Sequence, residues 1–364
     1  MTEHTAPTAI MPPSGYIANT MALCCHAADV IRLTTLDEII PIIADLHATK
    51  QAYVIVSSAS NVILPPMLEA TLVSPALMGM TVLAEDENSV TLEVMAGENW
   101  HDLVMHTVAQ GWYGLQNLAL IPSWVGAAPV QNIGAYGVQV SDVLVAVCAL
   151  HLPSLTWHVL SNAECHFSYR DSRFKQQAGD WLIASVTFKL SKIPDVNLNY
   201  GDVAQVAQSI AEQNGRTTIT PTDVMHAVIA IRQRKIPNPA TLPNCGSFFQ
   251  NPIVKMQTAQ ALLHDYPNLV NFAVKGADGT PDPTLTKLAA GWLIENAGLK
   301  GGGIAPILTH QHHALILTNH APYRAEQADI AAAMHLIQTQ VQTKFGVWLE
   351  PEPVWIGTDG AFSH

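Results

Sequence analysis

Residues 126–137 read Gly-Ala-Ala-Pro-Val-Gln-Asn-Ile-Gly-Ala-Tyr-Gly, and this stretch says most about the fold. It carries three glycines and an amide pair within twelve positions. Only small side chains let backbone N–H groups come close to a ligand such as a pyrophosphate. An ordinary structural turn is the alternative, but the length and density of the run favour a ligand-binding loop. No G-x-G-x-x-G pattern follows a strand, so a Rossmann dinucleotide site is not indicated.

A second small-residue loop lies earlier in the chain. The apolar run 53–56 predicts a short buried strand, and residues 57–61, Ser-Ser-Ala-Ser-Asn, follow it directly. A helix is expected over 36–46, where Thr35 and Glu38 form a capping-box pair. The two loops are therefore the candidate phosphate-binding elements of the chain.

The remaining pattern mixes helices and strands without an internal repeat. The alternating run 182–190 predicts a strand with one polar face, and Thr220, Pro221 and Asp223 open a helix. The other expected elements are strands at 90–94, 314–317, 350–352 and 354–356, and helices at 100–108, 258–264, 287–296 and 330–345.

A hydroxyl suited to acid chemistry stands in residues 244–252, Asn-Cys-Gly-Ser-Phe-Phe-Gln-Asn-Pro. Ser247 follows a glycine and precedes two aromatic residues that would exclude water. Such a serine suits proton delivery inside a closed pocket, although many buried serines simply bond to nearby backbone.

Two further groups of charged residues are candidates. Arg170 stands beside Asp171, which is usually a surface ion pair but in a site would bind a carboxylate or stabilise an enolate. Glu350 and Glu352 flank a proline, and because alternate residues of an extended chain point the same way, both could face one pocket. A solvated edge turn explains the second pair equally well.

Three histidines, His310, His312 and His313, lie within four positions. They invite a zinc interpretation, but no cysteine or H-E-x-x-H partner stands nearby, so hydrogen bonding is favoured and no metal is expected.

The composition limits the function further. The net charge is −12, which argues against broad nucleic-acid binding, and 5 scattered cysteines indicate free thiols in a reducing compartment. No apolar run is long enough to span a membrane, and residues 1–15 read as a flexible tail rather than a signal peptide. We expect a cytoplasmic protein, without nucleic-acid or membrane partners, and a monomer, since nothing in the sequence demands a dimer.

Taken together, these motifs identify a resemblance to the UDP-N-acetylenolpyruvoylglucosamine reductase family, in its longer form, across roughly residues 16–357. The pair Gln-Asn-Ile-Gly-Ala-Tyr-Gly and Gly-Ser-Phe-Phe-x-Asn-Pro is highly specific. The other matching segments are 19–20, 96–100, 114–122, 167–172, 200–202, 287–294 and 347–352.

The resemblance implies an α+β fold, with an FAD-binding module of the vanillyl-alcohol-oxidase type and a small α/β substrate domain. It implies a first FAD-binding subdomain at 16–62 joined by strands from 350–364, a second at 63–235, and a substrate-binding domain at 236–349. NADPH would reduce the flavin, whose N5 would then pass hydride to C3 of the enolpyruvyl ether of a UDP-sugar.

The resemblance also implies the roles of individual residues. Ser247 would give a proton to C2, and Arg170 and Glu352 would stabilise the enolic intermediate. Substrate would contact Tyr200, Lys235, Asn251 and His313. The cofactor-binding positions would be Ser57, Ser58, Ala59, Ser60, Asn61, Gly126, Ala127, Ala128, Gln131, Asn132, Gly134, Ala135 and Gly137.

This chain departs from the family pattern at four places. The first flavin loop lacks the usual Gly-x-Gly-Ser-Asn, so we expect a shifted backbone or weaker flavin affinity. His313, Gln250 and Trp355 stand where a glutamine, a lysine and an arginine are usual. Two other functions stay open at this point: a non-catalytic paralogue that binds a UDP-sugar or a partner, and a flavin oxidase acting on another substrate.

Overall fold

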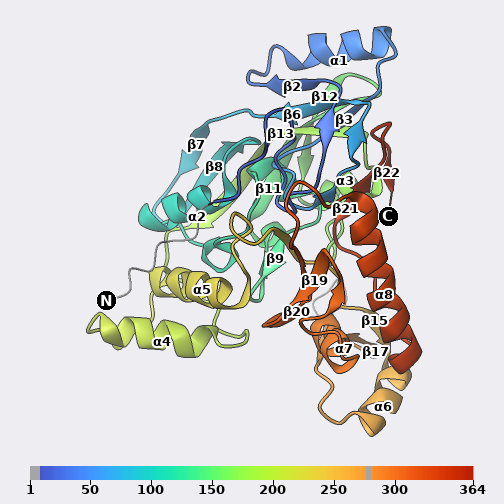
Figure 1. Cartoon of the computed structure of the whole chain (residues 1–364). Helices are drawn as coiled ribbons and strands as arrows, with labels where there is room; N and C mark the ends of the chain where they lie inside the picture. The colour runs from blue at the N-terminus through green and yellow to red at the C-terminus, as the bar shows by residue number, and fades with distance from the viewer. Residues whose placement is uncertain (1–8, 276–279, 364) are drawn as a thin grey trace, which may run out of the picture.

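The computed structural model describes residues 9–275 and 280–363 (Figure 1). Residues 1–8 of the predicted flexible tail lie outside this range. The α-helices are α1 Ile39–Ala48, α2 Trp100–Ala109, α3 Arg173–Gln176, α4 Val203–Gln213, α5 Pro221–Lys235, α6 Met256–Asp265, α7 Ala290–Asn296 and α8 Gln327–Phe345.

The N-terminal region forms a small parallel sheet, and the C-terminus forms a separate small sheet with β4. Strand β6 (Thr71–Pro75) lies between β2 (Val30–Leu33) and β3 (Tyr53–Ile55), so the first sheet extends beyond residue 62. β21 (Val354–Ile356) pairs in parallel with β4 (Val62–Ile63), and the last strand β22 (Phe362–Ser363) pairs with β21. Residues 354–363 therefore lie next to the loop 57–61.

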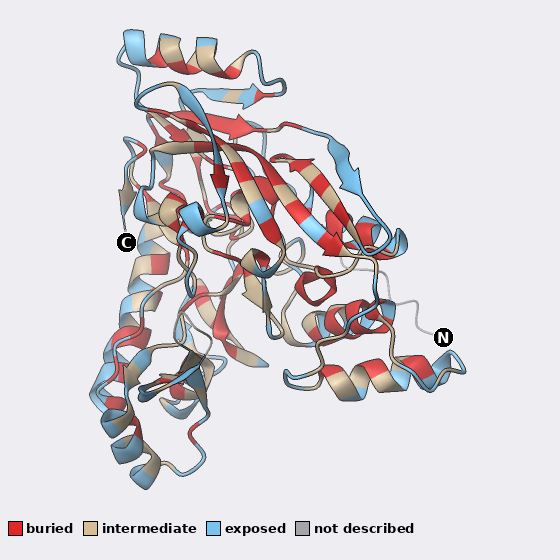
Figure 2. Cartoon of the chain, turned by 180° about the vertical axis from the view of Figure 1, so that it is seen from behind, coloured by how far each residue is buried: buried red, intermediate tan, exposed pale blue. Residues whose placement is uncertain are grey.

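A five-stranded antiparallel sheet forms the centre of the molecule, in the order β12-β11-β13-β8-β7. Its strands are β12 Thr156–Ser161, β11 Leu144–His151, β13 Trp181–Ser191, β8 Ser89–Met95 and β7 Met80–Glu85. The edge strand β7 is exposed along its whole length, whereas β8 alternates buried and half-buried residues (Figure 2). The prediction of one polar face on β13 was wrong over its first half, since Ile183 and Ser185 are both buried in this central strand.

Two short pairs lie beside these sheets. Strand β1 (His26–Ala27) pairs with β5 (Met67–Leu68), and β9 (Gly134–Ala135) pairs with β10 (Val138–Gln139) as a hairpin at the end of the loop 126–137.

The C-terminal unit contains two more antiparallel sheets. One has the order β14-β20-β19-β18, from Asn244–Ser247, His313–Asn319, Ile307–His310 and Gly303–Ile304, and it shares an apolar core with α7 and α8 (Figure 1). The other has the order β15-β17-β16, from Ile253–Lys255, Pro281–Leu288 and Asn271–Lys275. The helix expected at 287–296 begins only at Ala290, because residues 287–288 end β17.

Most predicted helices and strands are present, and their start and stop signals act as expected. Gly346 ends α8 in the left-handed conformation with a φ of 66°. Glu38 accepts from the backbone N–H of Thr35, but it is itself the N-cap residue of α1. Residues 350–352 form a single bridge rather than a strand, and α4 was not predicted.

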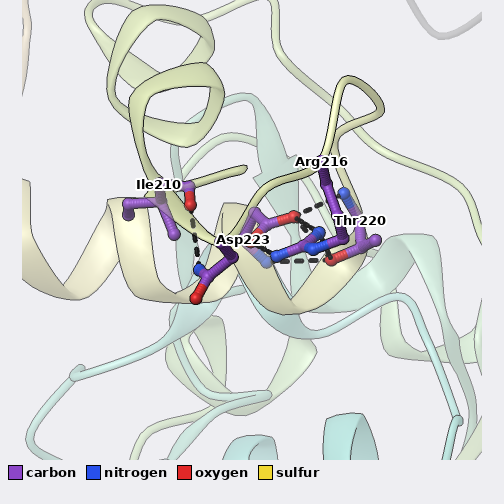
Figure 3. Close-up of polar contacts among 5 residues, drawn as sticks. Ile210, Arg216, Thr220 and Asp223 are labelled. Atoms are coloured by element: carbon purple, nitrogen blue, oxygen red, sulfur yellow. Dashed lines mark hydrogen bonds and ion pairs between the residues drawn. The ribbon is translucent and has the colours of Figure 1, made fainter. Parts of the chain in front are cut away.

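Helices α4 and α5 lie side by side, and a charged pair fixes their connection (Figures 1 and 3). Asp223 accepts from both terminal nitrogens of Arg216, and from the backbone N–H and the hydroxyl of Thr220. The capping box predicted from Thr220 and Asp223 is thus confirmed, with Arg216 added. The last turn of α5 carries Arg232 and Lys235 to the site described next.

Candidate active site

A cavity of about 1320 Å³ lies where the loops after β3, the loop 126–137 and the C-terminal unit meet. The proposed catalytic residues Ser247, Arg170 and Glu352 all line it. So do the substrate-binding candidates Tyr200, Lys235, Asn251 and His313, and the cofactor-binding candidates Ser57, Ser58, Ala59, Ser60, Asn61, Gly126, Ala127, Gln131, Gly134 and Ala135. Residues from most of the chain length therefore converge on one space.

Three of the cofactor-binding candidates do not line the cavity. Ala128 is buried in the core. Asn132 is buried, and its side chain holds the loop by donating to Ser168 O and accepting from Ser141 N. Gly137 has a φ of 80° and faces Asn197. In this structure these residues shape the loop rather than its cavity-facing surface.

Ser247 ends β14, directly after Gly246, whose φ of 78° favours glycine. The hydroxyl of Ser247 forms no hydrogen bond with another described side chain or backbone group. The buried ring of Phe249 lines the cavity and lies against that of Phe248, with 5.1 Å between centroids. Burial raises the pKa of the nearby Cys245 to about 12, so this cysteine stays a neutral thiol.

Arg170 and Glu352 form a loose ion pair, with 3.4 Å between Nε and Oε2. Arg170 sits at the tip of a tight turn closed by Ser168 and Asp171, and its φ of 56° is rare for a residue with a side chain. Its Nε is buried without a hydrogen-bond partner among the described residues. A strained backbone and an unpaired donor are typical of a ligand-binding site.

Glu352 is positioned by backbone pairing between two distant segments. Its N–H donates to Phe248 O at 2.8 Å, and Gln250 N donates to Glu350 O at 2.9 Å. Burial raises the pKa of Glu352, an effect opposed by the positive charge of Arg170. Of the two arrangements left open for Glu350 and Glu352, the structure excludes a shared pocket, because Glu350 is exposed and outside the cavity wall.

The two predicted flavin loops touch each other. Nδ2 of Asn61 donates to Oε1 of Gln131 at 2.9 Å. A Cβ on Gly126 would stand 2.6 Å from Cβ of Ala96, so only glycine fits where this loop passes the sheet. Ala59 adopts a φ of 49°. This conformation is strained for alanine but not for glycine, which the family pattern has at this position. The hydroxyl of Ser57 is buried and has no partner among the described residues.

The substrate-binding candidates are held by polar and aromatic contacts. The rings of Tyr200 and Tyr136 meet edge-on at 5.7 Å. Nζ of Lys235 lies 3.3 Å from Oδ2 of Asp202, so this cation is already paired. Asn251 accepts from the first N–H of α7, that of Ala290, at 2.9 Å, and so ties the Ser247 segment to the helix.

One cation that lines the cavity was missed in the sequence. Arg232 has its Nε buried and unpartnered among the described residues, and burial lowers its pKa. Lys287 is not part of the cavity wall, but its Nζ lies 4.1 Å from the ring centroid of Tyr169, which is, and burial lowers its pKa as well. The only signal for Arg232 was its place in the basic last turn of the helix, which reads equally well as a helix-end charge.

No group of described histidine, cysteine or acidic residues is arranged to hold a metal ion. Within the described ranges, no helix combines the length and apolarity that a bilayer crossing requires.

Comparison with known proteins gives a consistent picture. Residues 238–356 match the family described as UDP-N-acetylenolpyruvoylglucosamine reductase, C-terminal domain, and residues 27–152 match an FAD binding domain. The chain is 52% identical to a UDP-N-acetylenolpyruvoylglucosamine reductase of Psychrobacter sp. (strain PRwf-1), over 97% of this chain and 92% of that one. It is 43% identical to the reductase of Chromobacterium violaceum, over 92% of this chain and 95% of that one.

The fold also has a solved counterpart. The crystal structure of UDP-N-acetylenolpyruvylglucosamine reductase from Thermus caldophilus superposes with a TM-score of 0.60, at 20% identity, over 93% of this chain and 95% of that one. The α+β fold, with an FAD-binding module and a smaller C-terminal unit, is thereby confirmed.

Proposed function

The chain belongs to the UDP-N-acetylenolpyruvoylglucosamine reductase family, and from this premise we propose which of its residues carry the reaction. The protein is an FAD-dependent oxidoreductase that uses NADPH to reduce the enolpyruvyl ether of UDP-N-acetylglucosamine enolpyruvate to UDP-N-acetylmuramate. This step belongs to peptidoglycan synthesis, and so to cell-wall biogenesis, cell shape and cell division.

The residues of the two loops fit FAD. The close approach at Gly126, the unpartnered hydroxyl of Ser57 and the contact between Asn61 and Gln131 together describe a cradle of small groups with free polar atoms. A flavin held there would supply the hydride chemistry of the reaction, from NADPH to C3 of the enolpyruvyl group. We assign the loops 57–61 and 126–135 to holding this cofactor.

Hydride addition at C3 leaves negative charge on C2 and the adjacent carboxylate. The protein must stabilise this charge and then protonate C2. Arg170 offers an unpaired Nε and a fixed positive charge for that carboxylate. Glu352, whose pKa burial raises, can stay protonated and donate to the developing enolate. Ser247 then gives its hydroxyl proton to C2, in a niche that Phe248 and Phe249 shield from water.

The UDP-sugar would lie in the same cavity. Lys235 would supply the positive charge for the diphosphate, and Tyr200, Asn251 and His313 also line this cavity. For the chain's division we propose residues 236–349 as the substrate-binding domain. For the flavin module we propose two subdomains, at 16–62 and 63–235. Strand β6 lies in the second of these ranges but pairs with β2 of the first. A cytoplasmic location and a monomeric state also remain predictions.

The convergence of Ser247, Arg170 and Glu352 beside both flavin loops is the observation that carries this assignment. The test is a visible absorption spectrum of the purified protein, followed by an assay of NADPH oxidation with and without the UDP-linked enolpyruvyl sugar. A flavin spectrum and substrate-dependent oxidation are expected. A folded protein that cannot be reconstituted with FAD would overturn the assignment. No observation favours the non-catalytic paralogue or the oxidase.

A further inference from the structure

Residues 120–123, Leu-Ile-Pro-Ser, form part of the cavity wall and lie against the start of α2. Both ends of this wall segment are fastened by Trp100, the first residue of that helix. Its backbone N–H donates to Ser123 O at 3.0 Å, and its Nε1 donates to Leu118 O at 2.9 Å. Ser123 and Leu118 are also buried. The ends of the segment are therefore held by groups that do not titrate near neutral pH.

The middle of the wall segment depends on one histidine. Nδ1 of His101 accepts a hydrogen bond from the backbone N–H of Leu120 at 3.1 Å, and His101 itself lines the cavity. Within the described ranges, residues 120–122 form no other hydrogen bond, and none of the three is buried. Leu120 has a φ of 61°, a conformation that a leucine keeps only where its surroundings enforce it. The bond to His101 is the contact that enforces it.

This hydrogen bond requires a neutral imidazole in one fixed tautomer. A backbone N–H can only donate, so Nδ1 of His101 must carry a lone pair and the ring proton must lie on Nε2. A protonated imidazole carries a proton on both nitrogens. Its Nδ1–H would face the N–H of Leu120 as a second donor, and the bond would be lost.

The surroundings of the ring favour the neutral form. Burial lowers the pKa of His101 most, whereas Asp102 of the same helix raises it and Arg232 of α5 lowers it. The net effect is a pKa below the ordinary value of 6.5. Residues 118–126 carry no ionisable side chain, so the wall itself adds no charge. His101 is therefore neutral at pH 7, as its hydrogen bond to Leu120 requires.

We propose that His101 is a positioning residue of the flavin site: its neutral imidazole holds the Leu120 turn, and with it the wall 120–123, in the geometry that binds FAD, and protonation of the ring releases that wall. The inference rests on the proposed function, since it takes FAD as the occupant of the cavity. His101 acts through the backbone of Leu120, and no covalent bond forms or breaks.

The direction of the pH dependence follows from the lowered pKa. The hydrogen bond to Leu120 is fully present above about pH 6.5 and is lost as the pH falls through the lowered pKa of His101. FAD affinity should therefore be constant above about pH 6.5. Below the pKa of the ring, the dissociation constant should rise by up to tenfold per pH unit, because one proton is taken up when the wall is released.

The experiment measures FAD release from the FAD-loaded protein at several values between about pH 5 and pH 8, the range over which histidines titrate. Flavin fluorescence reports the free cofactor. His101→Asn places an amide oxygen at the position of Nδ1, which accepts the same hydrogen bond but does not titrate. This variant should bind FAD as tightly as the wild type at pH 8 and should lose the weakening in acid.

Two further variants complete the comparison. His101→Leu removes the acceptor, so its FAD affinity should be lower at every pH, by roughly three- to tenfold for one lost hydrogen bond. His106→Asn is the matched control, because His106 is an exposed histidine of the same helix outside the cavity wall, and it should keep the wild-type pH profile. Melting temperatures at pH 8 verify that each variant is folded.

The outcomes separate this inference from the proposed function. Acid weakening that is absent from the wild type, or equally large in His101→Asn, overturns the role of His101 and leaves the proposed function standing. A folded His101→Leu variant with wild-type affinity at pH 8 does the same. If His101→Leu does not fold, the comparison between wild type and His101→Asn decides. A wild-type protein that binds no FAD at any pH overturns the proposed function, and the inference with it.

Discussion

Nε of Arg170 lies 3.4 Å from Oε2 of Glu352, and Glu352 is itself held by a 2.8 Å hydrogen bond from its N–H to Phe248 O. The residue before Phe248 is Ser247. A guanidinium, a carboxyl group and a hydroxyl from three separate segments are thus linked through one ion pair and one backbone contact. Because the ion pair leaves the Arg170 Nε without a hydrogen bond, the arginine keeps a donor available for a bound anion.

Ser247→Ala should separate the two half-reactions. Reduction of bound flavin by NADPH should remain fast, because the hydroxyl takes no part in it. Reoxidation by the enolpyruvyl substrate should slow by about 10²–10⁴-fold, the usual contribution of a positioned acid. Stopped-flow absorbance of the flavin measures both steps. Slow reduction with intact reoxidation would show that the serine has been given the wrong role.

Arg170→Lys should be nearly as damaging, although it conserves the charge. A lysine ammonium is a point charge and does not reproduce the planar donor set that Arg170 presents from a left-handed turn. We expect kcat to fall by about 10²–10³-fold, as for the loss of one fixed donor to a developing oxyanion. Steady-state kinetics, with the flavin spectrum as a check of integrity, would test this, and a variant with normal kcat would contradict it.

Gly126→Ala should destabilise the protein through the flavin loop. The added methyl group would stand 2.6 Å from Cβ of Ala96, and overpacking of this kind costs about 1–3 kcal/mol. Thermal unfolding with and without FAD measures the loss. Gly291→Ala is the matched control, since this glycine also lines the cavity but its Cβ would meet nothing closer than 3.7 Å. Equal melting temperatures of the two variants would argue against the close contact.

Arg232→Met should stabilise the ligand-free protein and weaken its binding of FAD or the UDP-sugar. Nε of this guanidinium is buried and unpartnered, and the group lies near the like charge of Arg170. An apolar side chain therefore removes the free-energy cost of burying an unpaired charge. Thermal shift assays before and after addition of each ligand measure both effects. Arg234→Met, at an exposed position, should leave both nearly unchanged. A ligand-free protein that melts at a lower temperature would contradict the prediction.

Asp223→Asn should reduce stability at neutral pH, and this loss should diminish as the pH falls below about 3.8. Arg216, first, and then Thr220 hold the pKa of Asp223 well below its ordinary value of 3.8. Because the folded-state pKa is depressed, the stabilisation is complete above about pH 3.8 and is lost as the pH falls through the folded-state value. Losing hydrogen bonds to a charged group costs about 1–3 kcal/mol.

Urea unfolding of both proteins at pH 7 and near pH 3 measures this difference. The gap between their midpoints should be present at pH 7 and shrink in acid. Glu85→Gln is the control, since Glu85 and Lys192 form an exposed ion pair that should contribute little. A gap between wild type and Asp223→Asn that is independent of pH would show that the aspartate acts through packing alone.

Local signals predicted the secondary structure well where a single segment decides it. The capping box at Thr220, the stop at Gly346 and the alternation over 90–94 depend on neighbours within a few residues. The errors arise where tertiary contacts decide. Lys287 and Leu288 read as helix but pair with β15, and the inner position of β13 buries the face that looked polar.

The candidate site shows the same division. Ser247 and the loop 126–137 were recognisable because their chemistry lies in one short stretch. The sequence could not decide whether Glu350 shares a pocket with Glu352. In the structure, next to the single bridge between Phe249 and Pro351, Glu352 lines the cavity and Glu350 is exposed. Arg232 was missed, because only the packing of α5 against the cavity distinguishes it from other charges at a helix end.

The sequence by itself determined the family and supplied the candidates for the cofactor loops and the reacting groups, because glycine spacing and a serine before two phenylalanines are local properties of the chain. Only the tertiary structure decided which charges meet. Arg170 faces Glu352 rather than its neighbour Asp171, and Asn61 contacts Gln131. These pairs form because the C-terminal strand returns to β4 and brings distant segments together, and no pattern within a single segment records that return.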